Sequence, residues 1–496
     1  MCDTYGQKHA SAGLHFIRNI SLLLICLLTI VPVHSKSSTH IWFVQAGTKG
    51  DGKSIESPIG STIELERLSL PGDTIFLLPS SAALKGGLTL KSGQHVIGLT
   101  MNGQKPVIKN TNSTRNLGVG LILANNTRIS NLAIEDTFAS GVYGLNVSSI
   151  RIDGVDVRGA NRSQSFLNTQ YPTLPGSLPH GGMVFVHSES TAEIVVTSSS
   201  ITDAAGFGIV SITSNTAQSQ LNVSYTQVEG GSKIGFFDAG ITALAQGSTA
   251  QAKLQVLDSQ IWGRLSRSGR NIMLVASSGA KIASRVSRSY SGATGQDGIV
   301  AAVMQSPSEI NLHIADSLIE EAGQMNVEGS LINLDPLEPS LANKGRVSIE
   351  IKDSIIRNAG AVSGFEHVAA NVWIGGSQFS EDRPLAIGAY KVRITDSHIE
   401  GAGRVGLEFG NQSVLAKGQA EKSEYDVVLR GNSITNNGDA EVMIYAPKAR
   451  IDARKNCWGQ TEGLAEHRIA IRTPVKMSQL DTTAPISCDL KAPQLN

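Results

Sequence analysis

Val-Ser-Ile-Glu-Ile-Lys-Asp-Ser-Ile-Ile, residues 347–356, is an alternating apolar run that ends in the phrase Asp353-Ser354-Ile355-Ile356. Alternation of apolar and polar residues is typical of a β-strand with one buried face. A unit that recurs every few tens of residues indicates a repeat architecture, in which each unit packs against its neighbours. The same Asp-Ser phrase follows a short alternating run at three further places, Asp258-Ser259, Asp316-Ser317 and Asp396-Ser397.

Looser copies extend this repeat from about residue 117 towards the C-terminus. The closing apolar residues lie at positions 155, 201, 228, 261, 319, 356, 399 and 434, and we interpret the spacings of 46 and 58 residues as two rungs each, of 23 and 29 residues. A unit of this length is shorter than a propeller blade, which needs about 40–45 residues. Three short strands per unit, joined by turns rich in Gly, Asn, Asp and Ser, predict a parallel β-helix, an all-β solenoid.

The composition agrees with an all-β chain. Gly contributes 51 of the 496 residues and aromatic residues only 5%, as expected for short strands, many turns and an aliphatic core. Lys+Arg and Asp+Glu are both 42, so the formal net charge is zero. We therefore expect no nucleic acid as a partner and no overall attraction to an anionic membrane.

Residues 1–35 are predicted to be a signal peptide. Lys8 and Arg18 precede an apolar run from Ile20 to Val33, and this order is typical of a secretory signal. The run is shorter than the roughly 20 residues of a membrane span. An uncleaved anchor is the alternative, and we expect contact with the membrane only through this segment. The remaining chain is predicted to be secreted, periplasmic or at the cell surface.

Two cysteines, Cys457 and Cys488, remain after this segment. An exported chain meets an oxidising compartment, so we predict a disulfide bond between them. It would close a loop of roughly 30 residues and contribute on the order of 3 kcal/mol. Two buried free thiols are the alternative.

The ends of the repeat need atypical units, because a stack of strands leaves an apolar end exposed. Ser61 and Glu64 have the spacing of a capping box and predict a short helix, which Pro71-Gly72-Asp73 stops. The predicted organisation is a signal peptide at 1–35, an N-terminal cap with the first rungs at 36–116, the parallel β-helix at 117–465, and a C-terminal cap or tail at 466–496.

The chain resembles the right-handed parallel β-helix proteins of the pectin-lyase-like superfamily in three features. These are the opening strand, Gly-rich loop, short helix and strand around Pro71-Gly72-Asp73-Thr74-Ile75; the phrases Asp297-Gly298-Ile299 and Gly206-Phe207-Gly208-Ile209; and Asn456-Cys457-Trp458-Gly459 after the last rung. The resemblance covers roughly residues 41–465. It implies a right-handed parallel β-helix with a short N-terminal capping helix. It specifies a reaction poorly, because one fold hosts many functions.

The resemblance implies an exported carbohydrate-interacting protein, with a lyase or epimerase acting on an acidic polysaccharide as the expected activity. In lyases of this kind a Lys or Arg removes the proton next to a uronic acid carboxylate. A non-catalytic surface or periplasmic solenoid that binds glycans or proteins is the alternative, and a carboxylate-pair glycosidase is the third interpretation. The Asp-Asp, Gly-His-Gly and Arg-Ile-Lys phrases of the pectin hydrolases are absent.

The stretch between Ser259 and Gln296 concentrates basic residues and contains no Asp or Glu. Guanidinium groups bind carboxylates through two parallel hydrogen bonds, so a row of arginines on one face would form a cleft for an acidic polysaccharide. A solvated band paired with acids on neighbouring rungs is the alternative. The predicted substrate-binding residues are Arg264, Arg267, Arg270, Arg285 and Arg288.

Arg288 and Asp297 are the candidate catalytic residues in and beside this band. We assign no metal ligand and expect no cofactor. Calcium is the one cofactor that the resemblance would allow. Calcium needs several oxygen ligands at once, and Asp297, Glu320 and Glu321 are the acidic residues near the band. Three insertions, at 164–182, 331–345 and 365–390, are long enough for functional or disordered loops.

The stretch from Gly47 to Ser54 matches the phosphate-loop pattern, yet we expect no nucleotide as a ligand. A phosphate loop works because a helix begins at its lysine and directs backbone N–H groups at the phosphates. Here Pro58 and Gly60 interrupt the chain soon after Lys53, and the predicted helix starts later. A turn-rich loop is the expected structure.

Overall fold

The computed structural model describes residues 39–163, 180–231, 239–304, 307–333, 344–360, 369–378, 386–411, 422–459, 468–471 and 480–482. The chain divides into two units, Met1–Thr39 and His40–Asn496, and the second contains the helices and strands described below. The predicted signal peptide lies outside the described residues. In the part that is described, no helix is both long and apolar enough to cross a membrane.

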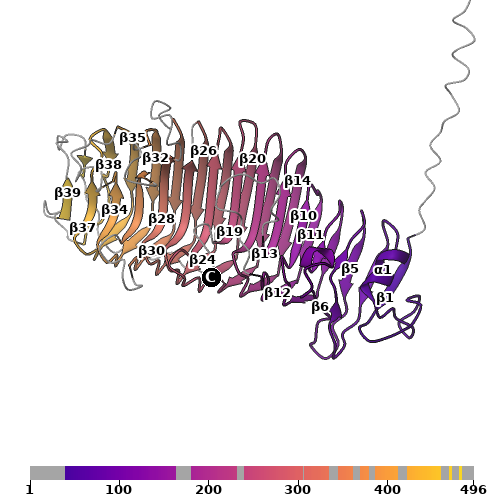
Figure 1. Ribbon diagram of the computed structural model, residues 1–496. Helices are drawn as coiled ribbons and strands as arrows, with labels where there is room; N and C mark the ends of the chain where they lie inside the picture. Colours follow the sequence, from indigo (N-terminus) through magenta and orange to yellow (C-terminus); the bar gives the residue numbers. More distant parts are fainter. Residues whose placement is uncertain are drawn as a thin grey trace, which may run out of the picture. The chain divides into compact units, whose positions relative to one another are not determined.

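The strands of the second unit form three parallel sheets, named A, B and C here (Figure 1). In the described ranges, sheet A contains β1 (Ile41–Val44), β2 (Thr74–Leu77), β5 (His95–Gly98), β8 (Arg128–Ser130), β11 (Ile150–Asp153), β14 (Thr191–Thr197), β17 (Gln218–Ser224), β20 (Gln251–Leu257), β23 (Lys281–Ser287), β26 (Glu309–Ala315), β29 (Arg346–Lys352), β32 (Ala389–Thr395), β35 (Glu424–Arg430), β38 (Ala449–Asp452) and β40 (Leu480–Asp481). Sheet B contains β3 (Leu84–Lys85), β6 (Val107–Lys109), β9 (Ala133–Glu135), β12 (Asp156–Arg158), β15 (Ser200–Thr202), β18 (Gln227–Glu229), β21 (Gln260–Trp262), β24 (Tyr290–Gly292), β27 (Leu318–Glu320), β30 (Ile355–Arg357), β33 (His398–Glu400) and β36 (Ser433–Thr435). Sheet C contains β4 (Leu88–Thr89), β7 (Leu121–Ile122), β10 (Val142–Leu145), β13 (Gly181–His187), β16 (Phe207–Ser214), β19 (Ala239–Gln246), β22 (Arg270–Ser277), β25 (Asp297–Met304), β28 (Met325–Asn333), β31 (Ala370–Gln378), β34 (Val405–Phe409), β37 (Ala440–Ile444) and β39 (Ile469–Ile471).

Through the repeat the chain visits sheet A, then B, then C, and returns to sheet A one rung further along. The predicted all-β fold, a parallel β-helix with three strands per rung, is confirmed. On β29 the side chains of Val347, Ile349 and Ile351 are buried, while the residues between them face outwards. Inward-facing aliphatic side chains of successive rungs therefore stack into one continuous core.

Helix α1 (Thr62–Leu68) lies at the N-terminal end of the β-helix beside β1 (Figure 1). The Ser61 side chain accepts a hydrogen bond from the Glu64 backbone N–H at 3.5 Å, and Leu65 is buried in the core. The predicted capping helix is confirmed. No helix begins at Lys53, so the stretch from Gly47 to Ser54 lacks the geometry of a phosphate loop.

The Asp-Ser phrase forms the turn between sheets A and B. The four aspartates adopt a left-handed backbone conformation, with φ between +48° and +54°: Asp258, Asp316, Asp353 and Asp396. Asp tolerates this conformation better than most residues because its short polar side chain interacts locally. The phrase is therefore structural, and the aspartate acts through its backbone conformation.

The serine of the phrase links neighbouring rungs. Ser259 Oγ donates to the Leu257 carbonyl at 2.7 Å and accepts from the Thr226 N–H at 3.2 Å. The Ser259 N–H in turn donates to Ser289 Oγ at 3.2 Å. The ladder runs on through Ser289, Ser317, Ser354, Ser397, Asn432 and Asn456. These buried side chains satisfy backbone groups that the tight turn would leave without partners.

Substituting Asp353 tests the role of the left-handed turn. We expect Asp353→Gly to leave the free energy of unfolding equal or up to about 1 kcal/mol higher, because Gly adopts positive φ without a steric penalty. Asp353→Val should lower it by about 1–2 kcal/mol, because a branched side chain clashes in this conformation. Urea unfolding measures the free energy of unfolding of both variants, and Lys352→Val, at the preceding strand position, is the control. Equal stability of the Gly and Val variants would contradict this account.

The interpretation of the 46-residue spacing as two rungs is wrong. Val157 pairs with Ile201 in sheet B, so β12 and β15 belong to adjacent rungs. The extra residues lie in the connection between β12 and β13, which lengthens one rung. The 58-residue spacing does contain two rungs, because Ile261 pairs with Ser291 and Ser291 with Ile319.

Candidate functional site

The five arginines predicted to bind substrate do not share one face of the β-helix. Arg264 and Arg270 are buried, 0% and 5% exposed, where the chain passes from sheet B to sheet C. Arg267 is exposed in the same connection. Arg285 is exposed on the outer face of β23, and Arg288 lies in the turn between sheets A and B. The expected single cleft lined by all five is not formed.

Arg264 has a structural role. Its Nη1 donates to the Gly230 carbonyl at 2.7 Å, and its Nη2 donates to the Gly206 carbonyl. Both glycines lie in the connections from sheet B to sheet C of the two preceding rungs. A buried guanidinium must be matched by hydrogen bonds, and here the carbonyls of successive rungs provide them.

Arg288 pairs with Asp258 of the previous rung. Its Nε and Nη2 donate to the two carboxylate oxygens at 2.7 and 2.8 Å. The hydrogen bonds from Arg288 hold the pKa of Asp258 below its usual value. Asp297 lies at a different corner, where β25 of sheet C begins. The structure therefore does not bring the two candidate catalytic residues together.

Asp297 belongs to a buried cluster of charged groups on sheet C. It is 0% exposed, and Arg270 Nε donates to its Oδ2 at 3.2 Å. The Met325 N–H donates to its Oδ1 at 3.3 Å. Glu328, on the next strand β28, is also within hydrogen-bonding reach of Asp297. One guanidinium and two carboxyl groups thus share this position.

Asp297 is the protonated carboxyl group of this cluster at neutral pH. Burial, and next the charge of Glu328, raise the pKa of Asp297 to about 8, against the opposing charge of Arg270. Arg270 balances one carboxylate, and a second ionised carboxylate would be buried without compensation. Asp297 therefore keeps its proton below about pH 8.

Glu328 begins a polar row on the outer face of sheet C. The positions in register on the five preceding strands hold no ionisable side chain: Val184, Val210, Thr242, Met273 and Val300. After Glu328 the register continues with Trp373 and Glu408. Glu328 is partly exposed, whereas Trp373 and Glu408 are 7% and 2% exposed. Arg404 forms an ion pair with Glu408. We name Arg270, Asp297, Glu328, Trp373, Arg404 and Glu408 the sheet C site.

The register sets the spacing of the two outer carboxylates. Glu328 and Glu408 are separated by one intervening strand, which carries Trp373. Two strand spacings place their backbones about 10 Å apart. Two carboxylates thus flank the strand of a tryptophan, an arrangement suited to acid–base chemistry.

The acidic residues near the basic band, Asp297, Glu320 and Glu321, do not have the arrangement of a calcium site. Glu320 pairs with Arg357 at 2.7 Å, and Asp297 pairs with Arg270. In the described part of the chain, no group of three or more His, Cys, Asp or Glu side chains could hold a metal ion. Calcium prefers six to eight oxygen ligands, so we derive no step through this ion.

Two predictions fall wholly or partly outside the described residues. Cys457 is buried and disulfide-bonded, and its predicted partner Cys488 is not described. Most of the long insertions, at 164–182, 331–345 and 365–390, also lie outside the described ranges.

The sequence-based prediction missed Glu328, Trp373 and Glu408. An alignment of the rungs by sequence could have found them. Each of the three residues follows an inward-facing aliphatic residue, at a position where earlier rungs mostly carry Val or Met. An ionisable residue that interrupts an apolar column is expensive to bury and indicates a function or a paired structural role.

No protein-family model matches the chain, and no curated protein matches it. Among solved structures, the fold is similar to the A-module of mannuronan C-5 epimerase AlgE6 from Azotobacter vinelandii, at 13% identity and a TM-score of 0.46, covering 80% of this chain and 93% of that one. It is also similar to the periplasmic alginate epimerase AlgG, at 10% identity and a TM-score of 0.41, covering 81% and 77%. A GH136 lacto-N-biosidase from Eubacterium ramulus matches at 12% identity and a TM-score of 0.40, covering 87% and 68%. These likenesses concern the fold alone.

Proposed function

We propose that the protein is an exported carbohydrate-active enzyme that cleaves glycosidic bonds at the sheet C site. The observation that carries this proposal is the buried cluster of Asp297, Glu328 and Arg270, in which burial and the charge of Glu328 raise the pKa of Asp297 to about 8. Perturbed carboxyl groups of this kind concentrate at catalytic sites, because acid–base chemistry needs one group protonated and another ionised.

The members of the site have separate roles in this proposal. Glu328 is the partly exposed member of the pair, so it relays the proton that Asp297 holds to the oxygen of the glycosidic bond. Glu408, which pairs with Arg404, takes a proton from the water whose oxygen attacks the anomeric carbon. The bond between that carbon and the leaving oxygen breaks. Asp297 is a positioning residue that keeps this proton next to Glu328.

The spacing supports hydrolysis with inversion of configuration. Inverting glycosidases separate their carboxyl groups by about 6.5–9.5 Å to admit a water molecule, and the backbones here are about two strand spacings apart, roughly 10 Å. Trp373 lies on the strand between them. The chain from Arg357 to Ala370 and that from Phe409 to Glu424 are long connections in sequence, whereas within the repeat sheets A and B are joined by two residues. Loops of this length commonly build binding sites.

Export is supported by the apolar segment that precedes residue 35 and by the disulfide bond of Cys457. Disulfide bonds persist in oxidising compartments and are rare in the cytosol. We therefore propose a secreted, periplasmic or surface location.

A lyase or epimerase acting on an acidic polysaccharide is the second candidate. Arg285 favours it, because this exposed arginine on sheet A forms no ion pair among the described residues and is available as a base or to a carboxylate. The sheet C site supports it less well. In the described part of that sheet, Arg270, Arg404 and Arg468 are each paired with a carboxylate, so none is left to neutralise a uronic acid.

A screen of the full-length chain against neutral and acidic polysaccharides tests the proposal. Hydrolysis would release reducing ends without new ultraviolet absorbance. A lyase would produce an unsaturated, ultraviolet-absorbing product, and an epimerase would exchange sugar protons with deuterated solvent without shortening the chain. Retention of a polysaccharide without any of these changes would show that the protein is a binding solenoid and would contradict the proposed enzyme activity.

A further inference from the structure

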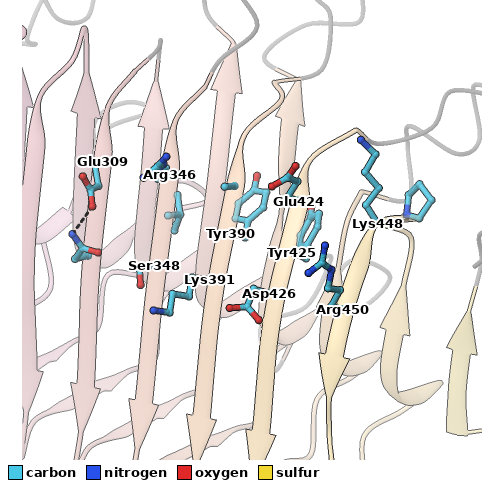
Figure 2. Close-up of a pocket in the computed structure, with 14 residues that line it drawn as sticks. Glu309, Arg346, Ser348, Tyr390, Lys391, Glu424, Tyr425, Asp426, Lys448 and Arg450 are labelled. Carbon is cyan, nitrogen blue, oxygen red and sulfur yellow. Dashed lines mark hydrogen bonds between the residues drawn. The ribbon is translucent and has the colours of Figure 1, made fainter. Parts of the chain in front are cut away.

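The outer face of sheet A contains an elongated hollow that is separate from the sheet C site. Its larger part has a volume of about 650 Å³ and extends over β26, β29, β32, β35 and the start of β38 (Figure 2). A smaller part of about 320 Å³ extends over β20, β23, β26 and β29. Both parts are lined by Asn311 and Ser348, so they form one continuous surface, named the sheet A hollow.

The hollow exists because three successive strands carry short side chains at the same register position. Ala283, Asn311 and Ser348 form this floor. Longer side chains stand at both ends of the same row, with Lys253 before it and Lys391 after it. Since strands lie about 4.8 Å apart, the row from Lys253 to Lys391 is about 19 Å long.

The basic side chains around the hollow are exposed and form no ion pair among the described residues. They are Lys253, Arg285, Arg346, Lys391, Lys448 and Arg450. Figure 2 shows Arg346 on β29, Lys391 on β32 and Arg450 on β38, all bordering the larger part. From β20 to β38 these cations span six strand spacings, about 29 Å.

The acidic side chains of the same surface are mostly engaged with other groups. Glu350 pairs with His313 at 3.3 Å, and Asp426 pairs with Arg393 at 3.0 Å. Glu309 accepts a hydrogen bond from Asn311 at 3.1 Å, the dashed line in Figure 2. The unpaired charge that the hollow offers to a ligand is therefore mainly positive.

We propose that the sheet A hollow binds a linear anionic polysaccharide that lies across the strands, along the axis of the β-helix. Its carboxylate or sulfate groups would face the unpaired Arg and Lys side chains, and its hydroxyl groups would meet Asn311, Ser348 and Glu309. The inference deepens the substrate class of the proposed function but does not depend on cleavage at Glu328.

The lining favours a glycan over a nucleic acid. Single-stranded nucleic acids are bound by basic grooves in which aromatic side chains stack on the bases. The aromatic residues that line the larger part, Tyr390 and Tyr425, are both 2% exposed and stack on one another with ring centroids 4.6 Å apart.

Binding of polygalacturonate to the full-length chain tests this inference. We expect the double variant Arg346→Ala/Lys391→Ala to raise Kd by at least about tenfold, since each basic group near an anionic surface contributes about 1 kcal/mol. Arg128→Ala/Arg151→Ala is the matched control, because these arginines are exposed on the same face of sheet A but lie outside the hollow. Ser348→Tyr should also weaken binding, because it fills the floor without changing charge.

The Kd values of these variants and ligands test whether the sheet A hollow binds an anionic polysaccharide. A Kd that rises with the hollow variants, stays constant with the control pair and rises with ionic strength supports it. Equal Kd values for both double variants would show that the polysaccharide does not bind in the sheet A hollow. Equal binding of neutral dextran, or tighter binding of polyglutamate or single-stranded DNA, would overturn the ligand class. Glu328→Gln should leave binding unchanged, so that a failed cleavage assay and a failed binding assay are distinct results.

Discussion

Replacing Glu328 with Gln is expected to lower kcat for polysaccharide cleavage by about 10²–10⁴-fold, the usual contribution of a general acid or base. Gln keeps the shape and hydrogen-bonding capacity of the side chain but cannot transfer a proton. Glu328 is partly exposed, whereas its partner Asp297 is buried. The measurement is the initial rate of product release with the polysaccharide identified by the screen. A variant with full activity would exclude Glu328 from the reaction.

Two controls separate catalysis from folding. Glu193→Gln changes an exposed glutamate on β14 of sheet A and should retain the full rate. The midpoint of thermal unfolding of Glu328→Gln should stay close to that of the unchanged chain, because the charge that it removes lies beside a second carboxyl group. A large drop in that midpoint would point to a structural role instead.

Through the pH profile, Asp297→Asn tests the role of the proton that Asp297 holds. In the unchanged chain Asp297 loses its proton as the pH rises through about 8, so the rate should decline there. Asn cannot ionise, so the variant should lose this alkaline limb and have a lower maximum rate. An unchanged decline of the rate near pH 8 in the variant would show that another group causes this decline.

His187 is expected to make the fold about 3 kcal/mol less stable near pH 4 than at neutral pH. The imidazole is 0% exposed, neither ring nitrogen has a hydrogen-bond partner in the described part of the chain, and burial lowers its pKa to about 4. Above pH 6.5 the group is neutral in the folded and unfolded chains. Between pH 6.5 and about 4 the imidazole is protonated in the unfolded chain but stays neutral in the folded chain, so the free energy of unfolding falls as the pH is lowered.

Urea unfolding at neutral pH and near pH 4 measures this effect as a difference between two proteins. His187→Leu removes the titrating group, so the stability gap between variant and unchanged chain should widen by about 3 kcal/mol over this range. Other titrating groups cancel in the comparison. His398→Leu, which removes a half-exposed imidazole from β33, is the control. Parallel stability curves for His187→Leu and the unchanged chain would contradict the prediction.

The repeat could be predicted because it is local. Alternation on β29 and the phrase Asp353-Ser354 involve neighbouring residues, and every rung carries the same information. The hydrogen bonds of the ladder, such as Ser317 N–H to Ser354 Oγ at 3.3 Å, follow once the rungs are stacked. The register between Val157 and Ile201 was mispredicted because an insertion and an additional rung lengthen a spacing equally.

The candidate site could be predicted only in part. Asp297 was identified next to the basic band, but its partners Glu328 and Arg270 lie on neighbouring strands, and contact between them depends on register. The arginines of the band are close in sequence, yet the triangular course of a rung sends Arg264 inwards, Arg285 to sheet A and Arg288 to a corner. Proximity along the chain therefore did not predict a shared face.

The sequence by itself determined the all-β repeat, the three-strand rung and the capping helix, because strand alternation, turn chemistry and a capping box are properties of short segments. The tertiary structure alone decided which side chains meet: the carboxyl pair on sheet C, and the row of short residues that makes the hollow on sheet A. Both depend on the stacking register between residues about thirty or more positions apart, and the physical reason is that parallel strands place side chains of successive rungs only about 4.8 Å apart.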